Sequence, residues 1–187
     1  MVKSLILCEG GDDEAFIRLF LKSLKSDLRK IEIKKLSSKS NFFKLKMYQD
    51  ENILAKIDTQ YNKILFIFDS DYKETGETNN GFYKSKSSIE EIIIKIKEYL
   101  GFDFYTDYYI VCNPITKNGN LEHLILSTLD KKPKECMEDL LNCIKPYHTD
   151  SNKKILLTGY KTIFKEPLYN FSHPNFNLLK QKLQALG

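Results

Sequence analysis

Acidic side chains stand at the ends of two apolar stretches in this sequence. Glu9 directly follows residues 3–8, and Asp69 and Asp71 follow residues 64–68. Carboxylates can transfer protons as general acids or bases, and their hard oxygens suit Mg²⁺ or Mn²⁺ better than zinc. No Cys or His pair in the sequence has the spacing of a zinc site. The residue types therefore indicate acid–base or magnesium chemistry.

These carboxylates need a sheet to bring them together. Both apolar stretches are short and unbroken, which is typical of strands buried on both faces of a parallel sheet. The carboxyl ends of parallel strands meet at one edge, where open sheets bind their ligands. Two like charges about 4 Å apart repel by about 4 kcal/mol at an effective dielectric near 20. Such a cluster therefore needs protons, basic side chains or a divalent cation.

A structural explanation is also available for some of these acids. Asp12 and Glu14 would lie in the first turn of a helix, where carboxylates complement the helix dipole. Asp69 could cap a turn. Two acidic motifs that each end an apolar strand nevertheless favour the metal site.

Strands and helices alternate over the first 130 residues, which predicts an α/β fold with a mostly parallel sheet flanked by helices. Ser87 and Glu90 have the spacing of a helix capping box, and the polar residues 72–86 before them are expected to form a loop. Residues 1–130 form the expected core, and residues 131–187 a mainly helical C-terminal extension packed on it. The expected strands are residues 3–8, 31–36, 64–68 and 105–111, and the expected helices are residues 16–28, 42–57, 87–100 and a segment after residue 119.

Composition limits the class of protein. The chain has 187 residues, 42% of them hydrophobic and 29% charged, with a net charge of +4. This excludes a disordered or collagen-like chain, and the net charge alone does not indicate a nucleic-acid partner. The first apolar run ends at Glu9, and no run approaches the roughly 20 apolar residues of a membrane helix, so we expect a soluble, cytoplasmic protein without a membrane partner. We expect reduced, mostly buried thiols at Cys8, Cys112, Cys136 and Cys143.

Positive charge is concentrated between residues 22 and 47. This segment contains nine basic and two acidic residues, which gives it a net charge of +7. A basic segment beside a metal site is what binding of a nucleic-acid backbone requires. Phe42, Phe43 and Tyr48 could stack on unpaired bases, or they could belong to the core beneath a solvated basic face. The candidate nucleic-acid-binding residues are Lys22, Lys25, Arg29, Lys30, Lys34, Lys35 and Lys39.

Residues 5–13 (Leu-Ile-Leu-Cys-Glu-Gly-Gly-Asp-Asp) and 66–71 (Phe-Ile-Phe-Asp-Ser-Asp) resemble the two signatures of the toprim domain. Topoisomerases, DnaG-type primases and overcoming-lysogenization-defect (OLD) family nucleases share this Rossmann-like domain. Residues 119–122 (Gly-Asn-Leu-Glu) are similar to a Gly-x-Leu-Glu segment of stand-alone toprim proteins and OLD-like nucleases. The resemblance covers about residues 3–130. Each motif is short, so the specificity of the resemblance comes from the order of the motifs and from their positions at the ends of strands.

The resemblance implies a role for each matching residue. Glu9 would act as general acid or base or share a metal, and Lys161 is the candidate for the lysine that OLD-like nucleases use downstream. Two Mg²⁺ ions (Mn²⁺ as a substitute) about 3.5–4 Å apart would activate water and stabilise the leaving oxygen. The implied metal ligands are Glu9, Asp13, Asp69, Asp71 and Glu122.

The leading hypothesis is a magnesium-dependent nuclease that acts on nucleic acid, with DNA favoured over RNA but not decided by the sequence. No tyrosine-bearing topoisomerase domain, primase zinc module or OLD-type ATPase domain is recognisable in 187 residues. A second hypothesis is therefore a non-catalytic module that binds metal and nucleic acid for a separate partner ATPase. A third is an aspartyl phosphatase, but its Asp-x-Asp motif would follow the first strand of the fold, whereas Asp69 follows about the third.

Overall fold

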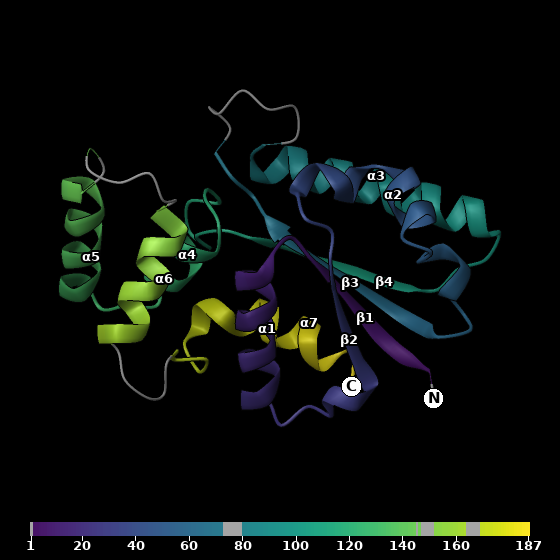
Figure 1. The fold of residues 1–187 in the computed structure, drawn as a ribbon, viewed down its shortest axis with the longest axis horizontal. Coiled ribbons are helices and arrows are strands. Elements are labelled where there is room, and N and C mark those ends of the chain that lie inside the picture. Colours follow the sequence, from purple (N-terminus) through teal and green to yellow (C-terminus); the bar gives the residue numbers. More distant parts are fainter. Residues whose placement is uncertain (1, 73–79, 145, 147–151, 164–168) are drawn as a thin grey trace.

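In the computed structural model, which describes residues 2–72, 80–144, 146, 152–163 and 169–187, four strands form one sheet. All pairings are parallel, and the strand order is β2-β1-β3-β4. The expected α/β class with a parallel, Rossmann-like sheet is therefore confirmed (Figure 1). The strands are β1 (Lys3–Cys8), β2 (Ile31–Lys35), β3 (Tyr61–Asp69) and β4 (Tyr105–Val111).

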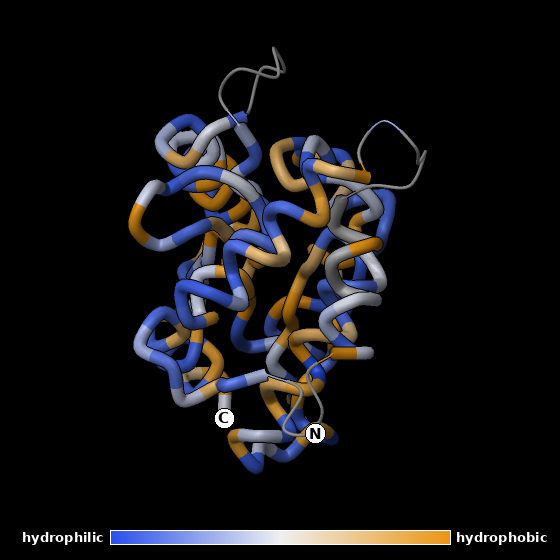
Figure 2. The backbone as a smooth tube through the Cα atoms, turned by 90° about the vertical axis from the view of Figure 1, so that its left-hand side faces the viewer, coloured by the Kyte–Doolittle hydropathy of each residue, from blue (hydrophilic) through white to orange (hydrophobic). Residues whose placement is uncertain are grey.

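The two central strands alternate their side chains between two hydrophobic layers. Leu5 and Leu7 of β1 face a cluster with α2 (Leu45–Asp50) and α3 (Phe82–Leu100). Ile6 and Cys8 face the opposite cluster, which includes α1 (Gly11–Ser23) and α7 (Asn177–Gln184). Helices therefore cover both faces, which explains why residues 5–8 of β1 and 64–68 of β3 are apolar without interruption. Figure 2 shows hydrophobic residues concentrated along the inner strands, with hydrophilic residues on the outer turns.

The C-terminal helices return to the same core. Beyond α4 (Leu121–Leu126), the chain forms α5 (Lys131–Ile144) and α6 (Asn152–Ile163), which pack against one another beside α4 (Figure 1). The chain then comes back to β1, where the Ser4 hydroxyl donates to the carbonyl of Leu186 at 2.7 Å. Phe171 stacks on Phe20 with the ring centroids 4.3 Å apart. This extension completes one face of the sheet.

Three expected helices differ from the structure. Helix α1 ends at Ser23, so Leu28 lies in a separate 3₁₀ turn. Residues 42–57 hold only the short α2 between two 3₁₀ turns, because Asn52 adopts a left-handed conformation with φ of 54°. Helix α3 begins at Phe82, and the Ser87 hydroxyl bonds to the Tyr83 carbonyl at 3.2 Å, so Ser87 lies within the helix instead of capping it. Of the expected loop, residues 73–79 lie outside the described residues.

Two further expectations concern the helices and the cysteines. Among the described residues, none of the helices combines the length and the apolar character needed to cross a bilayer. All four cysteines are free thiols; Cys8 and Cys112 are buried, but Cys136 and Cys143 on α5 are exposed. The expectation of mostly buried thiols is therefore wrong for α5, whose outer face carries both.

Candidate functional site

The two acidic motifs meet at the carboxyl edge of the sheet. After β1 the chain adds β2 on one side and then β3 on the other, so the topological switch point lies between β1 and β3. Ligands of open α/β sheets bind at this point. Here the backbone amide of Asp69 donates a hydrogen bond to Glu9 Oε1 at 2.7 Å. Residues 60 positions apart are thus joined directly.

Asp71 links this pair to the third motif. Its φ of 57° is left-handed, a region that aspartate tolerates better than most residues. The Asp71 amide donates to the Gly119 carbonyl at 2.8 Å, and the Gly119 amide donates back at 3.3 Å. This bridge places the start of residues 119–122 beside the Asp-x-Asp motif. Residues 9–13, 69–71 and 119–122 therefore occupy one region of the fold.

Lys39 enters this region from the loop after β2. Its side chain is buried, with the residue only 8% exposed. The ammonium Nζ donates to the Ser70 carbonyl at 2.6 Å and lies 3.3 Å from Asp71 Oδ2. It also donates to Asn80 Oδ1 at 3.4 Å. A lysine expected on a nucleic-acid-binding surface thus provides a buried positive charge among the carboxylates.

The electrostatic environment of Lys39 includes all three acids. Burial lowers the pKa of the Lys39 ammonium, whereas Asp71, Glu9 and Asp69 each act to raise it. The carboxylates therefore compensate only part of the desolvation cost. Conversely, the ammonium supplies the counter-charge that a group of carboxylates at low dielectric requires.

The Asp13 side chain forms a hydrogen bond at the start of α1. Its Oδ2 accepts a hydrogen bond from the Gly10 amide at 2.9 Å, which is the reciprocal half of a capping box. Asp13 is buried, and its negative charge contributes, after burial itself, to raising the pKa of the neighbouring Cys8 thiol to about 12. The structure thus gives this carboxylate a structural role at the edge where the sequence placed a metal ligand.

Glu122 lies buried in the first turn of α4. The adjacent His123 ring bonds through Nε2 to the Tyr72 hydroxyl at 2.7 Å and through Nδ1 to the side chain of Asn120. Burial lowers the pKa of His123. Gly119 has φ of 88°, and a Cβ there would lie 2.5 Å from the His123 ring, so this turn requires glycine.

Five of the remaining sequence candidates lie apart from this edge. Lys161 is exposed on α6, and no contact within the described residues joins it to the carboxylates. Four of the basic candidates (Lys22, Lys25, Arg29 and Lys30) are exposed between the end of α1 and the start of β2. Because Ser4 of β1 pairs with Ile31 of β2, that segment lies at the amino edge of the sheet, opposite Glu9.

Two more basic candidates pair with acids near the edge strand. Lys34 Nζ lies 2.8 Å from Glu51, and Lys35 Nζ lies 3.6 Å from Glu14. The basic segment is therefore divided between both ends of the sheet and does not form one continuous surface. Lys39 could have been singled out from the sequence, because it follows a predicted strand and so belongs to the carboxyl edge.

The aromatic residues of this segment belong mainly to the core. Phe42 and Tyr48 are fully buried, and the Tyr48 hydroxyl donates to the Phe42 carbonyl at 2.5 Å. Phe43 packs edge-to-face on Phe68. Stacking of Phe42 or Tyr48 on nucleic-acid bases is therefore excluded in this fold.

The described part of the chain holds no group of three or more His, Cys, Asp or Glu side chains arranged to bind a metal. The carboxyl edge instead combines Glu9, Asp69 and Asp71 with the ammonium of Lys39. No protein-family model, curated protein or solved structure matches the chain.

Proposed function

We propose that this protein is a magnesium-dependent phosphodiester hydrolase that acts on nucleic acid, in the manner of a stand-alone toprim nuclease. The observation that carries the proposal is the 2.7 Å hydrogen bond from the Asp69 amide to Glu9 Oε1. It joins two acidic motifs at the switch point of a parallel sheet, where substrates of such folds bind. Asp71 and Lys39 complete the charged groups there.

The donor chemistry fits Mg²⁺. Magnesium keeps several waters and commonly uses one or two carboxylates together with substrate phosphates. Asp69 and Asp71 are the proposed ligands, with Glu122 and Asp13 as further candidates from the motifs. A preformed group of three protein ligands is not required by this mode of binding. The bound ion would lower the pKa of a water molecule and stabilise the charge on the leaving oxygen.

Glu9 and Lys39 would contribute to this reaction in two ways. The hydrogen bond from the Asp69 amide fixes the Glu9 carboxylate, which can then take or deliver a proton at a defined position. Lys39 offsets the charge of the acids, so that an anionic phosphate can approach them. Its bonds to the Ser70 carbonyl and the Asn80 side chain hold the ammonium at the edge of the sheet.

A cleavage assay tests the proposal. Purified protein is incubated with supercoiled plasmid, single-stranded DNA and RNA in Mg²⁺ or Mn²⁺, and products are resolved by electrophoresis. We expect cleavage that EDTA abolishes and that Asp69→Asn and Asp71→Asn both remove. Asp139→Asn changes an exposed acid of α5 in the same way and should retain wild-type cleavage. Folding of each variant is checked by thermal melting.

One observation favours the alternative of a non-catalytic binding module. A lysine ammonium already compensates the carboxylates, and the described residues contain no preformed metal-binding group. A module that presents nucleic acid to a separate ATPase would bind the same probes without cutting any of them in either metal. That result would replace the nuclease with the module.

A further inference from the structure

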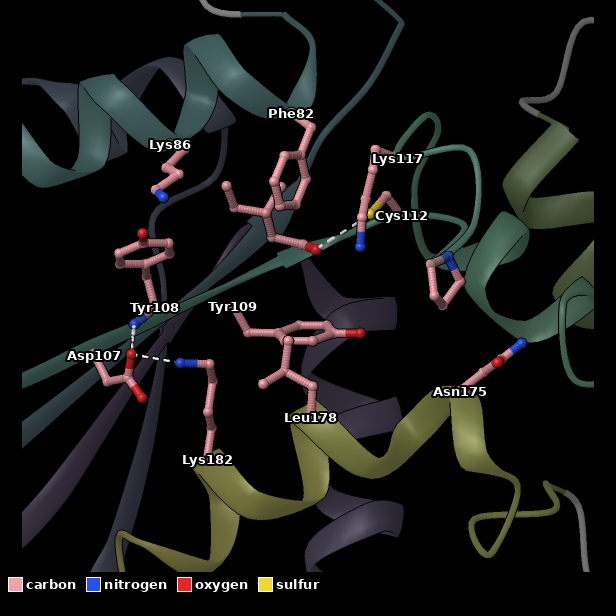
Figure 3. Close-up of a pocket in the computed structure, with 12 residues that line it drawn as sticks. Phe82, Lys86, Asp107, Tyr108, Tyr109, Cys112, Lys117, Asn175, Leu178 and Lys182 are labelled. Atoms are coloured by element: carbon pink, nitrogen blue, oxygen red, sulfur yellow. Dashed lines mark hydrogen bonds and ion pairs between the residues drawn. The ribbon is translucent and has the colours of Figure 1, made fainter.

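Two adjoining cavities lie beside the start of α3, one along the edge strand β4 and the other against the loop that follows β4. The first, about 310 Å³, is lined by α3, β4 and α7, and the second, about 390 Å³, by residues 80–84 and 116–118. Phe82 and Lys117 line both. Volumes of this size fall at the lower end of the range for small-molecule sites, about 300–1,000 Å³. Figure 3 shows Phe82 and Lys86 extending from α3, Lys182 from α7 and Lys117 from the loop after β4.

The second cavity is tied to the carboxylate region through Ser70, the buried residue between the two aspartates. The Ser70 hydroxyl donates to the Lys117 carbonyl at 3.1 Å, and the Gly81 amide donates to the Ser70 carbonyl at 2.9 Å. Asn80, which lines the cavity, accepts a hydrogen bond from Lys39. A ligand in this cavity would therefore lie next to the proposed catalytic residues.

The backbone at Lys117 is held in an uncommon conformation. Its φ of 59° is left-handed, which few lysines adopt, and such outliers often occur at functional sites. The Lys117 amide donates to the Asn113 carbonyl at 2.9 Å, and the Asn113 side chain accepts from the Ile115 amide at 2.9 Å. With Ser70 holding its carbonyl, Lys117 is fixed from both sides.

Lys117 also presents its charge beside an aromatic ring. Its Nζ lies 5.3 Å from the centroid of Phe82. The other lysines of the first cavity are paired: Lys182 lies 2.5 Å from Asp107 and Lys86 lies 3.9 Å from Glu90. Within the described part of the chain, no carboxylate lies within ion-pair distance of Lys117. An ammonium next to an aromatic face matches a ligand that carries both a phosphate and a planar base.

We propose that Phe82 and Lys117 form a subsite for an unpaired nucleotide, with the base against the Phe82 ring and the phosphate at the Lys117 ammonium. The proposal rests on the proposed function in one respect, because the nucleotide would belong to a strand whose phosphodiester lies at Asp69 and Asp71. A peptide paired with the edge strand β4 is the competing occupant. Lys84 and Lys117, which form no ion pair within the described part of the chain, favour the anionic ligand.

Binding of a fluorescent single-stranded oligonucleotide in EDTA tests the subsite without cleavage. Affinity is measured by anisotropy at several salt concentrations. Lys117→Asn removes the charge and tolerates the left-handed backbone, so the slope of log K against log salt should become shallower by about 0.7, the value for one phosphate contact. Lys132→Asn removes the charge of an exposed lysine on α5 by the same substitution; it is the control and should keep the wild-type slope.

The aromatic contact is tested separately. Phe82→Leu keeps an apolar side chain but removes the ring face, and it should weaken oligonucleotide binding at least about fivefold. Phe102→Leu changes an exposed phenylalanine beyond the C-terminal end of α3 and should bind as the wild type does. Unlabelled nucleoside monophosphate is also tested as a competitor. If it competes as strongly as unlabelled oligonucleotide does, the ligand of the subsite is a free nucleotide and not a nucleotide within a strand.

Three results would overturn the subsite. The first is wild-type binding by both Lys117→Asn and Phe82→Leu, and the second is an equal loss in the Lys132→Asn control. The third is displacement of the oligonucleotide by a strand-forming peptide when no nucleotide displaces it. The cleavage assay is independent of these results. Loss of cleavage in Asp69→Asn with retained binding supports both proposals, whereas binding through Lys117 without any wild-type cleavage removes only the nuclease.

Discussion

The Lys39 ammonium lies 3.3 Å from Asp71 Oδ2, deep in the carboxyl edge of the sheet. The lysine comes from the loop after an edge strand, and the aspartate follows a central strand. Their contact, together with the bonds from Lys39 to the Ser70 carbonyl and to the Asn80 side chain, joins three separate chain segments around one positive charge. This arrangement leads to the first two predictions.

Replacement of Lys39 by Met should lower the free energy of unfolding. Removing one member of a fully buried ion pair costs about 3–5 kcal/mol, but the Asp71 side chain is 35% exposed and water screens part of its charge. We therefore expect a loss of about 1–3 kcal/mol, measured by urea denaturation at neutral pH. Lys44→Met is the control. Lys44 is an exposed lysine at the end of the same 3₁₀ turn as Lys39, so its replacement should change stability little. Equal stability of Lys39→Met and wild type would contradict the counter-charge role.

Mg²⁺ should stabilise the Lys39→Met variant more than the wild type. The ammonium and a divalent ion would compete for the same carboxylates, so its removal should increase metal affinity and with it the rise in Tm. Thermal melting over a Mg²⁺ titration measures this difference. The response should disappear in the Lys39→Met, Asp71→Asn double variant, and an unchanged Mg²⁺ response would argue against a metal at Asp71.

Substitution of Gly119 by Ala should destabilise the turn that joins Asp71 to α4. The left-handed backbone disfavours a side chain, and the new Cβ would meet the His123 ring at 2.5 Å. We expect a loss of about 1–3 kcal/mol in urea denaturation. Gly11→Ala is the control, because no atom lies within 4 Å of a Cβ placed there. A stable Gly119→Ala protein would show that the ring can move aside without cost.

Alkylation should distinguish the cysteines by burial. In native protein at about pH 8, iodoacetamide should modify Cys136 and Cys143 and spare Cys8 and Cys112. Burial raises the pKa of Cys8 to about 12 and that of Cys112 to about 11, so neither forms appreciable thiolate at this pH. Mass spectrometry of peptides identifies the sites, and all four should react in urea. Rapid modification of native Cys8 would contradict the packed interface of β1 and α1.

Stability should decline at alkaline pH. Burial raises the pKa of Cys8 to about 12 and that of Tyr169 to about 12 in the folded state, above their ordinary values. The folded protein thus retains protons that the unfolded chain releases, so this contribution to stability is complete below about pH 9 and is lost as the pH rises toward 12. Each such group adds up to about 1.4 kcal/mol per pH unit to the slope. Urea denaturation between about pH 8 and pH 11 should show the decline, which Cys8→Ala should reduce.

Local patterns determined the α/β class and the strands. Residues 3–8 and 105–111 were predicted with the bounds that β1 and β4 have, because short runs rich in apolar and aromatic residues are visible in a few consecutive positions. The same patterns placed Glu9 and Asp69 at strand ends, and parallel pairing then made their meeting at one edge a natural expectation.

Tertiary structure decided the rest. The position of Lys39 after a strand indicates the carboxyl edge, but the sequence does not show which strands are neighbours, so only the fold revealed its contacts with the Ser70 carbonyl and Asp71. It also assigned Asp13 to a helix cap and brought Lys117 beside Phe82. Burial of a lysine or the shape of a cavity depends on contacts between segments far apart in the chain, and these contacts leave no periodic signal in the residues themselves.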